Sequence, residues 1–236
     1  MSEDLLSPSP RRSFLGRLAA GTAALGLTAF LPVTACAAEK TGAAAAATPD
    51  SNSTDPKSPD SNPWPGPLKV KHKMAVDAFA FNDGFPLAFA YTFMLPYEGM
   101  NPSPATPVVI LRHAGFPLAL TDAVWSKYKI GKAMKIMDPT TKAPAERNPF
   151  FNAKPGSLEI PDMAIDKLLA RGTIFGACNV ALHFLSAKFA AGAGVTPDVA
   201  LKDWTAGIIP GITVIPSGTW GVNRAQEAGC SYCAGG

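Results

Sequence analysis

Short apolar runs rich in β-branched residues alternate with longer segments of helical spacing over residues 70–233. This alternation predicts parallel strands joined by helices that cover both faces of one sheet. Strands are expected at residues 70–80, 107–113, 173–178, 211–216 and 230–233. Helices are expected at residues 85–97, 117–137, 161–171, 179–191, 196–204 and 219–228. The pattern predicts an α/β fold, a three-layer α/β/α sandwich with about five strands in the flavodoxin-like order 2-1-3-4-5.

The first 36 residues have the pattern of an export signal. Arg11 and Arg12 are followed by Phe14 and Leu15, which is a twin-arginine pattern. Residues 18–31 are uncharged and only mildly apolar, whereas a bilayer span needs roughly 20 strongly apolar residues. We therefore expect export in folded form to the periplasm by the twin-arginine pathway.

The end of this signal is compatible with two kinds of processing. Residues 33–36 match a lipobox, in which Cys36 is lipidated and becomes the mature N-terminus, whereas residues 35–37 match an ordinary small-x-small cleavage site. Residues 37–67 contain an alanine run and then Thr, Pro, Asp, Ser and Asn, which bury too little apolar surface to offset the entropy of ordering. We expect a disordered linker there and one domain over residues 68–236, tethered to a membrane only through the N-terminal lipid or signal.

Charge and motif content narrow the classes of partner and reaction. The net charge is +3 and the expected domain has no Lys/Arg cluster, so nucleic acid is not an expected partner. The sequence has no Gly-x-Gly-x-x-Gly, P-loop, Gly-x-Ser-x-Gly or His-Glu-x-x-His motif, so nucleotide binding and hydrolysis have no support. The sequence also identifies no cofactor.

Ligands of doubly wound sheets bind beyond the carboxyl ends of the strands. Cys178 ends the expected third strand and begins a helix, where the helix dipole and unpaired N–H groups favour the thiolate. We predict a nucleophilic or sulfur-carrying thiol; a buried, inert cysteine is the alternative. His113 is a candidate base or ligand, although the expected strand order leaves the two backbones roughly 10 Å apart. Other residues expected in the loops at this edge are candidates for ligand binding: Asn82, Asp83, Asn179, Ser217 and Trp220.

Cys230 and Cys233 form a Cys-x-x-Cys pair near the end of the sequence. The pair is compatible with a redox disulfide, half of a metal site, a structural disulfide or pairing across subunits. The expected topology puts Cys230 at the amino edge of the sheet and Cys178 at the carboxyl edge. A bond between these two is not expected, because bridged Cα atoms lie within roughly 7 Å of each other.

Four segments together resemble the DsrE/DsrF-like sulfur-relay family, and more closely its exported, twin-arginine branch: VVILRH at 108–113, DAVWSKYK at 122–129, FGACN at 175–179 and VIPSGTWGVNRAQEAGC at 214–230. The resemblance covers residues 70–233. It implies a flavodoxin-like fold, a homo-oligomer and a protein that donates or accepts sulfur. It also implies a persulfide on the cysteine that ends the third strand, a position that Cys178 matches. Export and the Cys-x-x-Cys ending depart from the relay pattern.

Three functions are compatible with these features. The first is thiol-based sulfur handling, in which Cys178 acts as a sulfur carrier or as the nucleophile of a sulfur transferase. The second is a periplasmic lipoprotein module that holds a metal or small ligand at the carboxyl edge without turnover. The third is a lipoprotein whose oligomer only scaffolds partners.

Overall fold

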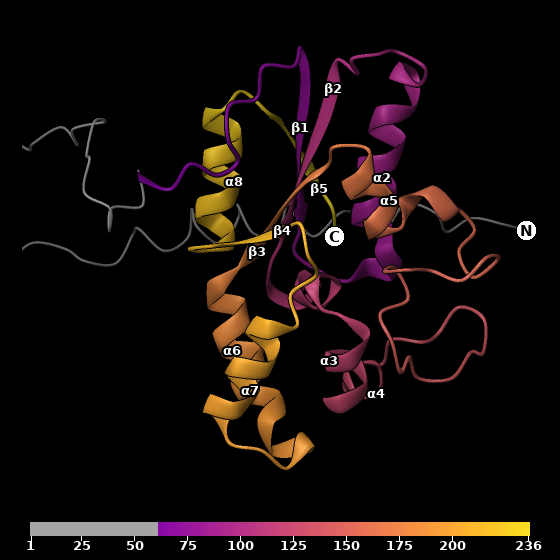
Figure 1. Cartoon of the computed structure of the whole chain (residues 1–236), viewed down its shortest axis with the longest axis vertical. Helices are drawn as coiled ribbons and strands as arrows, with labels where there is room; N and C mark the ends of the chain where they lie inside the picture. Colours follow the sequence, from indigo (N-terminus) through magenta and orange to yellow (C-terminus); the bar gives the residue numbers. More distant parts are fainter. Residues whose placement is uncertain (1–60) are drawn as a thin grey trace, which may run out of the picture. The chain divides into compact units, whose positions relative to one another are not determined.

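The computed structural model of this protein describes residues 61–236. The predicted export signal, the lipobox at Cys36 and the predicted linker up to residue 60 lie outside the described residues. Five parallel strands form one sheet, with helices on both of its faces (Figure 1). The strands are β1 (His72–Ala78), β2 (Ala105–Leu111), β3 (Ile174–Cys178), β4 (Ile212–Ile215) and β5 (Ser231–Ala234). The predicted α/β, flavodoxin-like class is confirmed.

The strand order is β4-β3-β2-β1-β5, which differs from the predicted order because β2 lies between β1 and β3. The register places Val109 beside Val76 on one side and beside Phe175 on the other. From β1 to β4 the chain moves steadily across the sheet, so right-handed connections put their helices on one face. Only the connection from β4 to β5 runs back, and it puts α8 (Gly218–Glu227) on the opposite face (Figure 1).

Two of the described helices, α7 (Pro197–Ala206) and α8, begin at a hydroxyl N-cap. Thr196 Oγ1 accepts the N–H of Val199 at 3.4 Å, and Ser217 Oγ accepts the N–H of Trp220 at 3.2 Å. The other α-helices of the described residues are α2 (Phe85–Met94), α3 (Asp122–Lys127), α4 (Ile130–Met134), α5 (Ile165–Ala170) and α6 (Asn179–Ala190). Short 3-10 turns are η2 (Asn82–Gly84), η3 (Leu95–Tyr97), η4 (His113–Ala119), η5 (Pro161–Met163) and η6 (Ala191–Ala193).

The single helix predicted over residues 117–137 is wrong, because this stretch consists of η4, α3 and α4 in succession. Leu120 is extended and bridges Ile208, which ends the first turn before α3. Lys129 has a left-handed φ of 49°, which breaks the helical path between α3 and α4. Gly131 then lets α4 approach the backbone of Ala145, where a Cβ would overlap the Ala145 carbonyl oxygen.

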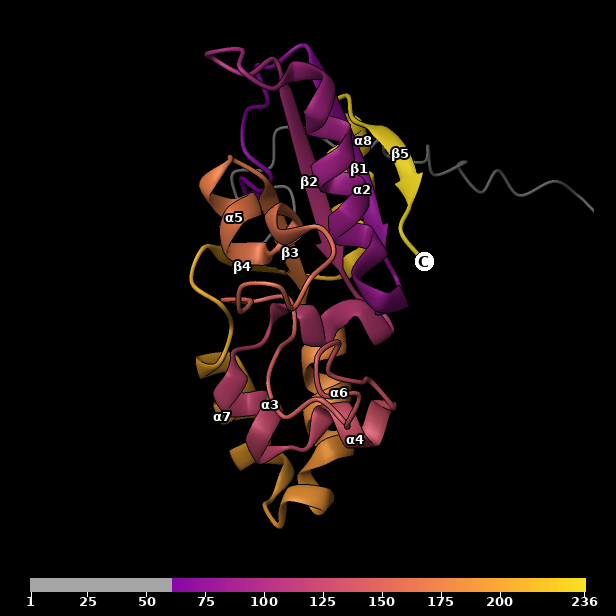
Figure 2. The same ribbon diagram turned by 90° about the vertical axis from the view of Figure 1, so that its right-hand side faces the viewer.

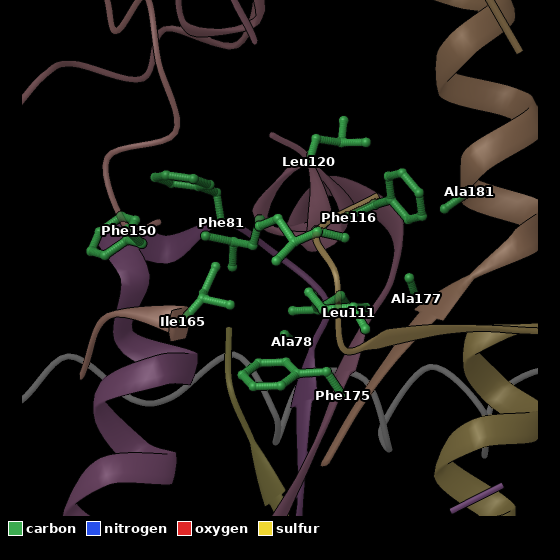
Figure 3. Packing of buried hydrophobic residues seen from close by; sticks show 14 of the residues in the cluster. Ala78, Phe81, Leu111, Phe116, Leu120, Phe150, Ile165, Phe175, Ala177 and Ala181 are labelled. Atoms are coloured by element: carbon green, nitrogen blue, oxygen red, sulfur yellow. The ribbon is translucent and has the colours of Figure 1, made fainter. Parts of the chain in front are cut away.

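The larger apolar core fills the sheet face that α2 and α5 cover and continues past the carboxyl edge of the sheet. Figure 3 shows Ala78, Leu111 and Ala177 from three strands below the ring of Phe116, which points toward Ala181 of α6. Burying a large apolar side chain contributes roughly 1.5–3 kcal/mol. This core therefore joins the sheet to the helices beyond its edge.

A smaller core lies between the sheet and α8, and it includes Trp64. The Trp64 side chain is 5% exposed, and its Nε1 donates to the Phe175 carbonyl at 3.3 Å. Gly176 makes room for it, since a Cβ there would lie 2.7 Å from the indole ring. The domain boundary predicted between residues 67 and 68 is therefore too late. Trp64 is the one aromatic side chain of residues 37–67, and it packs into the folded part.

Helices α3, α4, α6 and α7 lie beyond the carboxyl edge of the sheet rather than alongside the strands (Figures 1 and 2). Trp204 of α7 is fully buried among them. Its ring lies 6.2 Å from Phe116, 5.7 Å from Tyr128 and 5.6 Å from Phe189, measured between centroids. Within residues 61–236, none of the helices has both the length and the apolar character needed to cross a bilayer.

Candidate functional site

A cleft of about 960 Å³ opens beyond the carboxyl edge of the sheet, between α6 and α4. Its inner end is lined by residues that follow three neighbouring strands: Arg112 and His113 after β2, Cys178 at the end of β3, and Ser217, Gly218 and Thr219 after β4. Its outer part is lined by α6 and by α4 with the residues just before it. The position beyond the carboxyl ends of the strands is the one that the fold class predicts for a ligand.

Cys178 is both the last residue of β3 and the N-cap of α6. Its Sγ accepts the N–H of Ala181 at 3.3 Å, so the sulfur takes the place of the hydroxyl or carboxylate that usually caps a helix. The side chain is only 5% exposed, yet it lines the cleft. The positive end of the α6 dipole and a backbone donor therefore both face the sulfur.

His113 begins η4 with a left-handed φ of 47°, a conformation that histidine adopts more readily than most residues. Its exposed ring stacks on Phe79, with 4.3 Å between centroids and 3° between planes. The predicted order, which placed another strand between β2 and β3, is wrong because these two strands are neighbours. Neighbouring strands lie about 4.8 Å apart, so the backbones beside His113 and Cys178 are closer than expected. Both side chains line the same cleft.

Arg112 is held at the inner end of the cleft by a buried carboxylate. Its Nε and Nη2 donate to the two carboxylate oxygens of Asp77 at 2.6 and 2.8 Å. The Tyr232 hydroxyl also donates to Asp77, at 3.0 Å, and the guanidinium lies 4.6 Å from the centroid of Phe79. Hydrogen bonding to Asp77 raises the pKa of Arg112, so the guanidinium stays cationic, and its charge lies within electrostatic reach of Cys178.

Gly218 brings the start of α8 against Arg112. A Cβ at this position would overlap the Arg112 side chain, so only glycine allows the approach. The sequence pattern identified the loop at Ser217 and Gly218 as part of this edge but did not identify Arg112 and Asp77 as site residues. The available signal was Asp77 itself, the one charged residue in the otherwise apolar second half of the strand, because a buried carboxylate needs a cationic partner.

The other predicted loop residues do not line this cleft. Asn179 is the first residue of α6, and Trp220 packs in the smaller core with its ring 6.1 Å from Trp64. Asn82 donates to the Gly235 carbonyl at 3.1 Å, while Asp83 lines a second cleft of about 480 Å³ beside α2. Of the predicted site residues, Cys178, His113 and Ser217 come together.

The three cysteines that the structure describes are free thiols. Cys230 is buried just before β5, and Cys233 lies within β5, so the extended chain separates their Cα atoms by about 10 Å. This is beyond the roughly 7 Å that a disulfide bridges, so the structure contradicts an intrachain bond between them. As expected, Cys178 and Cys230 lie at opposite edges of the sheet. In the described part of the chain, no cluster of three or more His, Cys, Asp or Glu side chains suits a metal ion.

We expect mild oxidation of the folded protein with diamide to leave Cys230 and Cys233 unbridged. Forming the disulfide would require β5 to detach from β1, since the extended backbone holds the two sulfurs apart. The check is thiol alkylation followed by peptide mass spectrometry, with the same oxidation repeated in urea as the control. A Cys230–Cys233 disulfide in the folded sample would show that the β5 geometry described above is wrong.

Comparison of the chain with protein-family models and with curated proteins finds no match. Among solved structures, the chain is similar to the MTH1491 protein of unknown function from Methanobacterium thermoautotrophicum. The two are 14% identical with a TM-score of 0.37, over 69% of this chain and 98% of that chain. A likeness at this level carries no functional inference.

Proposed function

We propose that this protein is an exported, thiol-based sulfur carrier in which Cys178 accepts sulfane sulfur as a persulfide. The observation that carries the proposal is the position of Cys178 Sγ, which caps α6 and lines a large cleft at the carboxyl edge of the sheet. Cysteines that exchange sulfur need access to a reactant and a positively polarised environment. Cys178 has the cleft, the helix N-terminus and the nearby cation of Arg112.

The proposed transfer involves no net oxidation or reduction. The Cys178 thiolate bonds to the terminal sulfur of a persulfide R–S–SH, and the S–S bond of the donor breaks. Its electron pair leaves with R–S⁻, while the proton stays on the transferred sulfur to give Cys178–S–SH. Attack by an acceptor thiolate on this terminal sulfur returns Cys178 to the thiolate and completes the relay.

His113 and Arg112 have separate roles in this proposal. His113 lines the cleft and is exposed to solvent, so it would accept the Cys178 thiol proton and return a proton to the leaving thiolate. Arg112 is permanently cationic and fixed by Asp77, so it would stabilise the negative charge on the sulfur atoms as the S–S bond breaks.

Features of the sequence support the proposed location of the protein and the proposed persulfide. The twin-arginine pattern at Arg11 and Arg12 supports export, and the lipobox at Cys36 supports a membrane tether. The resemblance to the sulfur-relay family supports the persulfide on Cys178 and a homo-oligomer. A ligand-binding module without turnover is the second candidate, favoured by the volume of the cleft.

We expect purified protein treated with inorganic polysulfide to gain the mass of one sulfur atom at Cys178. Because Cys178 is the thiol that lines the cleft, Cys178→Ser should gain none under the same conditions, whereas Cys233→Ser should react like the parent. Intact-mass spectrometry over time is the measurement, in a Cys36→Ser background so that the fourth cysteine does not contribute. Equal uptake by Cys178→Ser and the parent protein would overturn the proposal.

A further inference from the structure

We infer that the cleft binds a small organic anion with an apolar body, with its charged end at Lys129, Lys132 and Lys188 and its other end at Cys178. The inference deepens the proposed function, on which it rests for the sulfur atom at the inner end. The ligand class is then an organic persulfide or polysulfide that carries a carboxylate or sulfonate at the far end of an apolar chain.

The charges of the cleft all have one sign. Its lining includes Arg112 and the three lysines but, among the described residues, no aspartate or glutamate. Asp77 balances Arg112, whereas Lys129, Lys132 and Lys188 have no ion pair with any residue that the structure describes. Cations around a recess with apolar walls attract an anion more strongly than the same charges on an open surface.

Between the two ends, the cleft wall is apolar. Val180 and Phe184 lie one turn apart on α6 and are 61% and 65% exposed, although large apolar side chains are usually covered. Leu185 and Phe189 of α6 and Met134 of α4 also line the cleft. Such a surface favours a hydrocarbon or aromatic body over a fully hydrated ion.

The distance along α6 between Cys178 and Lys188 determines how long the ligand must be. Cys178 caps α6 and Lys188 lies near its last turn, so about 15 Å of helix axis separates them at 1.5 Å per residue. Phe184 lies between these ends. A ligand with an extended body of about 10 Å would reach from the sulfur to the lysines, given the length of a lysine side chain. The volume of about 960 Å³ is that of a small-molecule site.

The test uses three octyl compounds that cannot exchange sulfur: octanesulfonate, octanol and octyltrimethylammonium. Their affinities for the Cys178→Ser protein are measured by isothermal titration calorimetry. We expect octanesulfonate to bind at least about tenfold more tightly than the cation, because the lysines favour one charge and oppose the other. Equal affinity for the anion and the cation, or no binding of octanesulfonate, would overturn the inference.

Charge-reversal variants test where the anionic end of the ligand binds. Lys132→Glu combined with Lys188→Glu should weaken octanesulfonate binding by about tenfold or more. Lys135→Glu combined with Lys167→Glu makes the same change in net charge outside the cleft lining and should leave the affinity within about twofold. Equal weakening by the two pairs would contradict a site at these lysines.

Failure of this inference is distinguishable from failure of the proposed function. Inorganic polysulfide has no apolar body, so sulfur loading of the parent protein with this donor tests the sulfur-carrier function without testing the ligand class. Loading without octanesulfonate binding would overturn the ligand class alone. Octanesulfonate binding in a protein whose Cys178 never takes up sulfur would overturn the sulfur-carrier function alone.

Discussion

Replacing Trp204 with alanine is expected to lower the free energy of unfolding by about 3–5 kcal/mol. The side chain is fully buried, and its ring contacts Phe116, Tyr128 and Phe189. Alanine would leave a cavity among the helices beyond the carboxyl edge, which cannot collapse without moving α6. The measurement is urea unfolding followed by circular dichroism, compared with the parent protein.

The matched control for this change is Trp204→Phe. The Trp204 Nε1 is buried without a hydrogen-bond partner within residues 61–236, so phenylalanine keeps most of the aromatic contact and removes an unpaired donor. We expect a loss well below that of the alanine variant. Equal losses for the two variants, or less than about 1 kcal/mol for alanine, would mean that Trp204 does not anchor the helices that line the cleft.

Replacing Asp77 with asparagine is expected to lower the free energy of unfolding by about 3 kcal/mol and to slow sulfur loading. Asparagine has the shape of aspartate but leaves the charge of Arg112 without its carboxylate, and breaking a buried ion pair is more costly than losing one hydrogen bond. Loading should slow because the guanidinium is no longer held at the inner end of the cleft. Chemical denaturation and the polysulfide time course measure the two effects.

Tyr232→Phe is the control for the Asp77 variant, since it removes one hydrogen bond to Asp77 and keeps the ion pair. Tyr232→Phe should lower the free energy of unfolding by about 1 kcal/mol and leave the rate of sulfur loading nearly unchanged. A larger loss for Tyr232→Phe than for Asp77→Asn would contradict the placement of the ion pair at the centre of this network.

The elements of the fold were predictable where local chemistry determines them. Thr196 and Ser217 begin helices as N-caps, and the apolar runs around Val76, Val109 and Phe175 form strands. The strand order was not predictable from these runs, because buried parallel strands have similar compositions. The break at Lys129 was also missed, since a left-handed lysine depends on tertiary packing rather than on helix propensity.

The candidate site was predictable at its inner end alone. Cys178 ends a strand, and His113 and Ser217 follow strands, so any parallel sheet brings them to the carboxyl edge. The outer end depends on α4 meeting α6 beyond the sheet, a contact between segments far apart in the sequence. The available signal was the spacing of Val180, Phe184 and Lys188 along one helix, which does not distinguish an exposed row from a buried one.

The proposed chemistry is tested most directly by locating the first sulfur that the native protein accepts. The folded protein is exposed briefly to limiting polysulfide, trapped with iodoacetamide and analysed by peptide mass spectrometry. Burial raises the pKa of the Cys230 and Cys233 thiols, which keeps them protonated and slow to react. We expect the trapped persulfide on the peptide that contains Cys178, with Cys230 and Cys233 carrying only the alkyl group. A persulfide on Cys230 or Cys233 while Cys178 stays unmodified would contradict Cys178 as the sulfur acceptor.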